Sequence, residues 1–254
     1  MDLGAEVLRR LERLHVRAWP ALETVRIEGW LWRYSGDGSQ RANAVSTVEF
    51  SARRAAAALD ALDRARGASA RVHTFRAGSP PELAALLPAY REGEAPITMS
   101  KAVEHGVGWP IDVEATGHAT EEWLDVHPTA ISGDRRSANR LPPPWVFILC
   151  RRYGRAISTA LGVVDGGLAV GRMRRDPRGA EAVLRTLEAW AARSGARSLG
   201  PQVGTGNAPA RTLYRRLGFA SAREKRLLGL AAGMPRRLDA ARLYDLIGRE
   251  PGPS

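Results

Sequence analysis

The spacing of hydrophobic positions changes along this chain and predicts both strands and helices. Short apolar runs typical of strands occupy residues 30–34, 43–50, 72–75, 97–103, 111–114, 147–150, 156–164, 168–173 and 199–203. Apolar residues recur at helical spacing in 55–66, 81–87, 180–194 and 207–218. We therefore predict an α/β (α+β) fold.

Residues 199–219 form the most informative segment. The apolar run 199–203 contains one glutamine, Gln202, and ends in a glycine-rich loop, as a strand would. Asn207 stands at the N-cap position of the following helix, and Gly218 can take the left-handed position after its end. The segment is predicted to form strand, loop and helix.

Three apolar runs upstream, at 147–150, 156–164 and 168–173, are predicted to form consecutive antiparallel strands. The turn between the second and third is Asp165-Gly166-Gly167, which is typical of a tight hairpin. A helix over 180–194 follows, and Gly195 is placed to end it.

The pattern N-x-x-A-x-x-L-Y-x-x-x-G-F, from Asn207 to Phe219, resembles the acetyl-CoA-binding core of the GNAT superfamily of acyltransferases. The resemblance implies a GNAT fold, with a mixed central sheet flanked by helices. It also implies that Asn207 lies beside the pantetheine arm and that Tyr214 faces the CoA sulfur. A phenol, with an unperturbed pKa near ~10, can protonate a leaving thiolate. The tyrosine taken alone also fits a helix residue that packs its ring on the core.

The loop that holds the CoA pyrophosphate in this family has the pattern Q/R-x-x-G-x-G/A, and residues 174–180 here read RRDPRGA. Aligned without gaps, Arg175 takes the first position, Ala180 the last, and Arg178 replaces a glycine. Alternatively, Gly179 is that glycine and the loop is shortened. The resemblance implies the following cofactor-binding residues: Met173, Arg174, Arg175, Arg178, Gly179, Ala180 and Asn207.

Residues 28–45 resemble the opening segment of a bacterial, two-lobed subgroup of GNAT proteins, with Ala44 in place of a serine. This predicts a GNAT-like N-terminal lobe over 1–105, a GNAT acetyltransferase domain over 106–232 and a tail helix over 233–254. The tail could pack on its own domain or on a second subunit, which leaves a homodimer open. Arg41 and Asn43 have either a structural or a further role.

The formal net charge is +11, but lysine occurs only at Lys101 and Lys225, and the arginines are spread over the whole chain. Dispersed arginine indicates a compositional bias rather than a specific nucleic-acid surface. We find no run of membrane-spanning length and no signal-peptide core, so a cytoplasmic protein without membrane attachment is expected. The single cysteine, Cys150, lies in an apolar run and is expected to be a buried hydrophobic residue.

The sequence therefore predicts an acetyl-CoA-dependent N-acetyltransferase in which an amine attacks the thioester directly and Tyr214 is the general acid. The alternative is a non-catalytic CoA- or small-ligand-binding regulatory module, which the altered loop favours. The histidines lack the spacing of a metal site, so no metal is expected. No single general base stands out among His127, Glu121, Glu122 and Asp125. The acceptor is open between amino acid, polyamine, antibiotic, peptide N-terminus and protein lysine.

Overall fold

The structure of the protein is a computed structural model. It describes residues 5–27, 30–35, 44–46, 71–75, 90–92, 96–106, 108–127, 144–175 and 177–230. Several predictions fall outside these residues: the helices at 55–66 and 81–87, the tail at 233–254, and any role of Arg41 and Asn43.

The described residues form both helices and strands. The helices are α1 (Ala5–Ala18), α4 (Glu121–Val126), α6 (Pro177–Arg193) and α7 (Ala208–Arg216). The strands are β1 (Glu23–Ile27), β2 (Trp30–Tyr34), β3 (Ala44–Ser46), β4 (Arg71–Phe75), β5 (Tyr90–Glu92), β6 (Pro96–Ala102), β7 (Val113–Thr116), β8 (Trp145–Arg152), β9 (Arg155–Asp165), β10 (Leu168–Arg175), β11 (Ser198–Leu199), β12 (Gln202–Gly204) and β13 (Ala220–Leu230).

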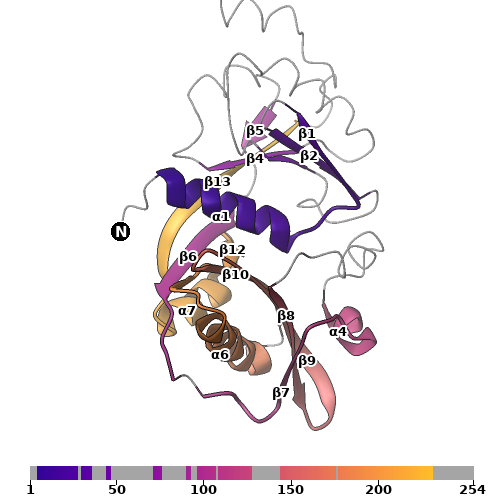
Figure 1. Cartoon of the computed structure of the whole chain (residues 1–254), viewed down its shortest axis with the longest axis vertical. Helices are drawn as coiled ribbons and strands as arrows, with labels where there is room; N and C mark the ends of the chain where they lie inside the picture. Colours follow the sequence, from indigo (N-terminus) through magenta and orange to yellow (C-terminus); the bar gives the residue numbers. More distant parts are fainter. Residues whose placement is uncertain are drawn as a thin grey trace, which may run out of the picture.

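A single mixed sheet connects these strands in the order β1-β2-β3-β4-β13-β6-β11-β10-β9-β8-β7. Strand β12 also pairs with β6, and β5 with β13. The pairs β3–β4 and β10–β11 are parallel, and the others are antiparallel. In Figure 1, α1 crosses the sheet, α6 and α7 lie together below α1 on one side of β8 and β9, and α4 lies on the other side of these strands. The mixed sheet flanked by helices confirms the predicted fold class.

The predicted meander is confirmed in β8, β9 and β10, which pair antiparallel in chain order. Asp165 pairs with Leu168, so Gly166 and Gly167 alone form the turn, with φ of 52° and 83°. Two successive positive φ values are those of the hairpin turn whose twist matches the flanking strands, and glycine adopts them without strain.

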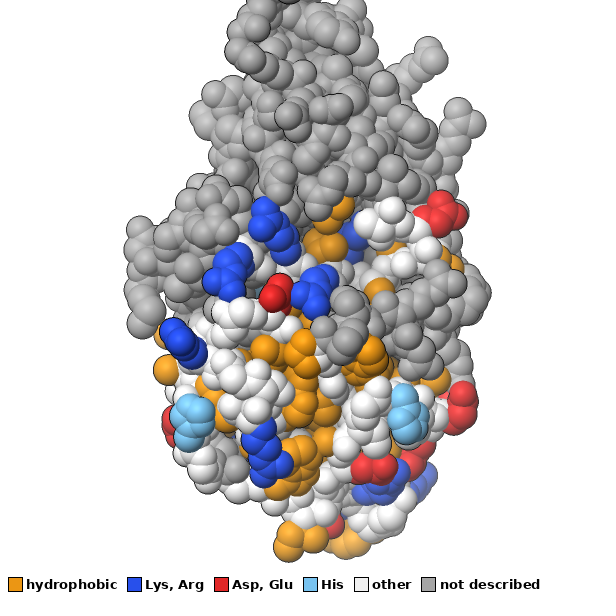
Figure 2. All heavy atoms as spheres, in the orientation of Figure 1, with side chains coloured by type: hydrophobic (Ala, Val, Ile, Leu, Met, Phe, Trp, Pro, Cys, Tyr) orange, Lys and Arg blue, Asp and Glu red, His pale blue; other side chains and the backbone are white. Residues whose placement is uncertain are grey.

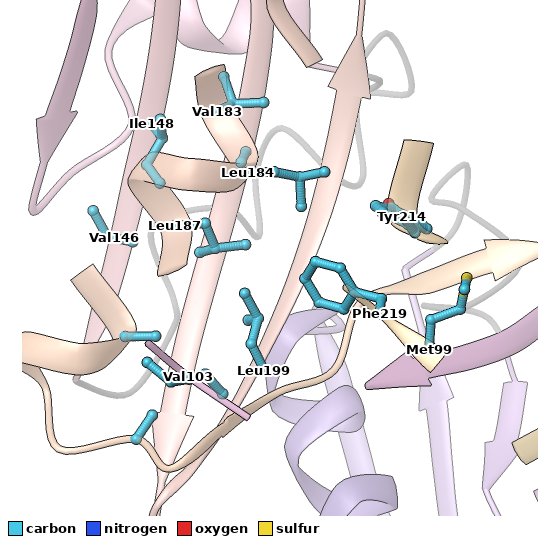
Figure 3. Close-up of a cluster of buried hydrophobic side chains, with 14 of the residues drawn as sticks. Met99, Val103, Val146, Ile148, Val183, Leu184, Leu187, Leu199, Tyr214 and Phe219 are labelled. Atoms are coloured by element: carbon cyan, nitrogen blue, oxygen red, sulfur yellow. The ribbon is translucent and has the colours of Figure 1, made fainter. Parts of the chain in front are cut away.

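Helix α6 covers one face of the meander. Its Val183, Leu184 and Leu187 are at most 1% exposed and share a core cluster with Val146 and Ile148 of β8. Figure 3 shows the three side chains of α6 in the same cluster as Val146 and Ile148. The helix ends as predicted, because Gly195 takes φ 77° and the Ala196 N–H donates to the carbonyl of Ala191 at 2.9 Å.

A glycine in β9 lets α6 approach the sheet this closely. A Cβ atom on Gly162 would lie 2.5 Å from Leu187 Cδ1 and 2.8 Å from a ring carbon of Trp190. Both contacts are shorter than real Cβ contacts, and Leu187 is fully buried. The close helix-sheet contact therefore depends on the absence of a side chain at this position.

Helices α1 and α4 cover the opposite face of the meander. Leu14 of α1 and Trp123 of α4, each 1% exposed, pack with Phe147 and Leu161 in a second cluster. The Trp123 indole N–H donates to the carbonyls of Ile148 and Ala160, both at 3.1 Å. The sequence analysis did not predict helix α1, so its contribution to this face was not anticipated.

Strand β6 joins the regions on either side of residue 105, where the domain boundary was predicted. It pairs with β11 and β12 on one side and with β13 on the other, and β13 goes on to pair with β4 and β5. The strand β13 itself was missed by the sequence analysis. Strands that precede residue 105 in the sequence therefore pair with strands that follow it. The division into lobes stays a prediction.

A buried ion pair connects β6 to α6 and α7. The Lys101 ammonium lies 2.8 Å from Glu188 Oε1, with side chains 9% and 7% exposed. It also donates to the carbonyl of Leu217, at the end of α7, at 3.2 Å. Burial lowers the pKa of Lys101, but hydrogen bonds to Glu188 and Glu104 outweigh burial and leave the pKa raised.

Candidate active site

Strands β10 and β12 separate after a short parallel contact. Leu168 and Ala169 of β10 pair with Ser198 and Leu199 of β11, and the Gly200 N–H then donates to the Ala169 carbonyl at 2.8 Å. Beyond this point β12 pairs with β6. Among the described residues, no strand pairs with residues 170–175 of β10 on this side. The predicted single strand over 199–203 is wrong, because Gly200-Pro201 interrupts it and proline has no N–H for the ladder.

The edge of β10 that faces this gap carries main-chain hydrogen-bonding groups. In a strand, the N–H and C=O of successive residues point to alternate edges. Because the Ala169 carbonyl points to the β11 side, the main-chain groups of Gly171 and Met173 point to the same side. Met173, which the resemblance implied as a cofactor contact, thus presents main-chain groups at the gap.

Helix α7 begins and ends as the sequence predicted. Asn207 is its N-cap, and the side-chain Oδ1 accepts from the Ala210 N–H at 3.1 Å. Gly218 has φ 85°, and the Phe219 N–H donates to the Tyr214 carbonyl at 2.9 Å, which completes the left-handed C-terminal motif. The exposed Asn207 lies three residues beyond the end of β12.

Tyr214 lies on the buried side of α7. It is 4% exposed and packs against Phe219, with ring centroids 5.6 Å apart. In Figure 3, Tyr214, Phe219 and Met99 lie together on one side of Leu199, and the side chains of α6 lie on the other. The packing interpretation of this tyrosine is therefore confirmed for its ring, and a chemical role of its hydroxyl stays a prediction.

The connection between β10 and α6 is short, as the alternative of a shortened loop predicted, but strand and helix extend further into 174–180 than expected. Strand β10 continues through Arg174 and Arg175, which pair with Thr159 and Ser158 of β9, and α6 begins at Pro177. One residue lies between strand and helix. The strand is longer because β9 supplies partners for both arginines, and proline at the first helical position favours the early start.

Gly179 and Ala180 belong to the first turn of α6, and both are buried. A Cβ atom on Gly179 would lie 2.6 Å from Ser158 Oγ, so this glycine permits close packing on β9. Arg178, between them and Pro177, is exposed. The first N–H groups of an α-helix have no partner within the helix, so Arg178 and Gly179 carry amides of the type that binds anions, and Ala180 follows directly after them.

Charged side chains join the first half of α6 to α7. Glu181 of α6 accepts from Arg216 of α7 at 2.6 Å and from Arg185 at 3.0 Å. Figure 2 shows one face of the molecule, on which Lys and Arg side chains gather at the level that α1 occupies in Figure 1, above a band of hydrophobic side chains. Part of the positive charge on α1 is neutralised, because Arg17 forms a salt bridge with Asp165 at 2.8 Å.

The segment proposed to supply a general base has mainly packing and pairing contacts. His127 is 3% exposed, stacks on Trp123 at 4.1 Å and places Nδ1 2.9 Å from Thr159 Oγ1. Glu122 accepts from Arg151, which also pairs with Glu114 at 2.7 Å. Glu121 and Asp125 are exposed. These contacts give His127 and Glu122 structural roles, and no base stands out from the geometry.

Cys150 is buried, and burial together with the nearby Asp112 carboxylate raises the pKa of its thiol. This confirms the expectation of a buried hydrophobic residue. Within the described ranges, no group of three or more His, Cys, Asp or Glu side chains could hold a metal ion. None of the described helices is both long and apolar enough to cross a membrane.

The sequence analysis assigned no role to two polar residues near the gap, namely Gln202 of β12, the strand that borders it, and Thr98 of β6, which pairs with Gln202. Thr98 is 1% exposed, and Gln202 interrupts the apolar pattern of its strand. For Gln202, the available signal was a glutamine inside a short apolar run. The position of Thr98 depends on a strand pairing that the sequence pattern does not show.

Two strands that separate after a parallel start, each followed by a helix, define a GNAT-type fold, and solved structures agree. A GCN5-related N-acetyltransferase from Kribbella flavida is similar at a TM-score of 0.64 and 16% identity, over 92% of this chain and 97% of that one. A GNAT-family protein from Novosphingobium aromaticivorans is similar at 0.55 and 20% identity, over 82% and 92%. A tandem GNAT protein from the clavulanic acid biosynthesis pathway is similar at 0.53 and 11% identity, over 90% and 88%.

Residues 5–228 match the family described as "Probable histone acetyltransferase Rv0428c C-terminal", and the chain belongs to this family. It is thus a member of the GNAT superfamily of acetyltransferases, as the sequence motif predicted. No curated protein matches the chain.

Proposed function

We propose that the protein is an N-acetyltransferase that transfers the acetyl group of acetyl-CoA to an amine by direct attack. The amine nitrogen forms a bond to the thioester carbonyl carbon, the carbon–sulfur bond breaks, and the sulfur takes a proton from the Tyr214 hydroxyl. The amine loses a proton to a base or water chain. The observation that carries this proposal is the separation of β10 from β12, with a main-chain edge of β10 facing the gap that no strand among the described residues covers.

The gap fits the pantetheine arm and the thioester of acetyl-CoA. Main-chain groups of Gly171 and Met173 would hydrogen-bond the arm and polarise the thioester carbonyl. Asn207, at the N-cap of α7, would lie beside the arm. Tyr214, three helical residues beyond Arg211, would reach the sulfur from the buried side of α7.

The first turn of α6 fits the pyrophosphate. The first-turn amides at the start of α6 and the positive end of the helix dipole favour an anion beside Arg178, Gly179 and Ala180. The exposed Arg178 side chain adds a charge, and Arg174 and Arg175 are close in sequence. Neutralisation by arginine would replace part of what a longer glycine-rich loop supplies in the family motif.

A second candidate function is a non-catalytic CoA- or small-ligand-binding module. The one-residue connection between β10 and α6 favours it, because a short connection leaves few amides to surround a pyrophosphate. Gly179 also favours it, since its missing side chain serves contact with Ser158. The first candidate function requires turnover and the second does not, and both are compatible with this fold.

Calorimetric titration with acetyl-CoA tests the proposal, with desulfo-CoA and ADP as reference ligands. We expect micromolar binding that weakens in Arg178→Ala and Asn207→Ala. Arg193→Ala is the matched control, because Arg193 lies at the opposite end of α6 and stacks on Trp109 at 4.7 Å. Absence of binding at millimolar acetyl-CoA would refute the proposal, whereas binding without transfer to any amine would favour the second candidate.

The Tyr214→Phe variant tests the general acid. Phenylalanine keeps the ring against Phe219, so folding and acetyl-CoA affinity should be unchanged. We expect kcat to fall by about 10²-fold or more, the usual contribution of a positioned acid. Equal rates for both proteins across pH, with chemistry shown to be rate-limiting, would exclude Tyr214 from this role.

A further inference from the structure

The loop between β12 and α7 is rich in glycine. It runs from Gly204 through Thr205 and Gly206 to Asn207, the N-cap of α7. The Asn207 N–H donates to the Gly204 carbonyl at 3.0 Å, and the Ala208 N–H donates to the Gly206 carbonyl at 3.0 Å. Glycine gives the backbone on both sides of Thr205 a wide choice of conformations. A contact at Thr205, between the two glycines, therefore restricts this loop more than a contact at either end.

Arg211 of α7 makes this contact. Its Nη1 donates to the Thr205 carbonyl at 2.8 Å, and its side chain is half-buried. Side chains of an α-helix lean toward the N-terminus of the helix, so an arginine at the fourth helical position can reach back past the cap. A hydrogen bond from a charged donor is stronger than one between neutral groups. Because Ala210 and Tyr214 fix α7 in the core cluster, Arg211 ties the loop to a well-packed helix.

The loop follows the strand that borders the gap. Leu199 pairs with Ala169 where β11 and β10 run parallel. Gly204 lies five residues beyond Leu199, and Arg174 lies five residues beyond Ala169. The loop after Gly204 is therefore at about the same level along the gap as the end of β10, where α6 begins. A cofactor with its pyrophosphate at the first turn of α6 would pass this loop with its pantetheine arm.

We propose that Arg211 is a positioning residue for the cofactor, because it holds the loop in the conformation in which Asn207 meets the pantetheine arm. The inference rests on the proposed function and adds a residue that acts through the loop rather than by contact with the cofactor. Without the bond from Arg211, Thr205 and its flanking glycines sample more conformations, and acetyl-CoA must order them when it binds. Cofactor affinity then falls. The chemical step is unchanged, because the core cluster, rather than this loop, holds Tyr214.

Hydrogen exchange measures the order of the loop without any need for activity. The amides of Asn207 and Ala208, which donate within the loop, should exchange faster in Arg211→Met, because methionine keeps an unbranched stem but has no donor. Arg215→Met is the matched control, since Arg215 is exposed and lies one turn further along α7. Arg211→Lys should restore slow exchange, because lysine can supply the single N–H that the Thr205 carbonyl accepts. We expect Tm to differ by less than about 2 °C among these proteins.

Calorimetry then separates positioning from direct contact with phosphate. We expect the Kd of acetyl-CoA to rise about 10-fold in Arg211→Met, which is about 1.4 kcal/mol of binding free energy. In Arg211→Lys and Arg215→Met it should stay within about threefold of the wild-type value. The nucleotide part of the cofactor, 3′-phospho-ADP, lacks the pantetheine arm, so its Kd should be the same in all four proteins. With an amine that is acetylated, Arg211→Met should raise KM for acetyl-CoA and leave kcat unchanged.

The proposed function and the role of Arg211 fail in different ways. Failure of the wild-type protein to bind acetyl-CoA refutes the proposed function and this inference with it. Equal acetyl-CoA Kd values for Arg211→Met and Arg215→Met overturn the positioning role alone. Weaker binding of 3′-phospho-ADP by Arg211→Met would show a direct phosphate contact, and a lower kcat together with a lower Tm would show a structural role in α7; either result also overturns the positioning role. Arg211→Gln, whose shorter side chain places no donor at Thr205, replaces Arg211→Met if the latter folds poorly.

Discussion

The ion pair between Lys101 and Glu188 allows a quantitative test of the packing between β6, α6 and α7. At 2.8 Å and an effective dielectric constant of about 20, the attraction is about 6 kcal/mol. Desolvation of the two groups offsets most of this, because both side chains are at least nine-tenths buried. In Lys101→Met, Glu188 loses its counter-charge while it stays buried. We therefore expect the free energy of unfolding to fall by about 3–5 kcal/mol, the usual cost of removing one partner of a buried pair.

A double-mutant cycle measured by guanidinium denaturation checks this value. Replacing both residues, in Lys101→Met/Glu188→Leu, leaves no buried charge and should recover most of the lost stability. The two effects are then strongly non-additive, with a coupling energy of about 2 kcal/mol or more. A loss below about 1 kcal/mol in the single variant, or effects that add within about 0.5 kcal/mol, would refute the reasoning.

Three further expectations concern stability and reactivity. Gly162→Ala should cost about 1–3 kcal/mol through its clash with Leu187, whereas Gly117→Ala, which has no atom within 4 Å of the added Cβ, should leave Tm unchanged. An unchanged Tm for Gly162→Ala would show that α6 moves freely on the sheet. Because the pKa of Lys101 is raised above 10.5, its contribution is complete at lower pH and should be lost only as pH rises through that higher value; denaturation midpoints from pH 7 to 11 would detect an earlier loss. Cys150 should react with a thiol reagent at pH 8 only after unfolding, and rapid labelling of the native protein would contradict its buried position.

Local signals in the sequence predicted much of the region from β8 to α7. The N-cap Asn207, the C-terminal Gly218 and the Asp165 turn each depend on the chemistry of a few adjacent residues, and all three were confirmed. The GNAT motif also specifies how many positions separate its residues. An uninterrupted helix such as α7 converts this spacing directly into relative position. These features need no knowledge of distant segments.

The errors have a common physical origin in long-range pairing. The extension of β10 to Arg175 depends on partners in β9, and the early start of α6 depends on a close fit of Gly179 against Ser158. The burial of Lys101 depends on Glu188, 87 positions further along the chain by their numbers. Propensity and periodicity describe each segment alone, so tertiary contacts decide where its ends lie.

The place of β6 between β12 and β13 has a consequence for how the protein is made. During synthesis β6 leaves the ribosome well before any of the strands that hold it on either side. Its unpaired main-chain groups must therefore stay available until β13 has emerged, and such pairing between distant segments slows folding. A chaperone that protects exposed strand edges would act in this interval, and a ribosome-bound chain that stops before residue 220 should be sensitive to proteolysis throughout the region that β6 later organises.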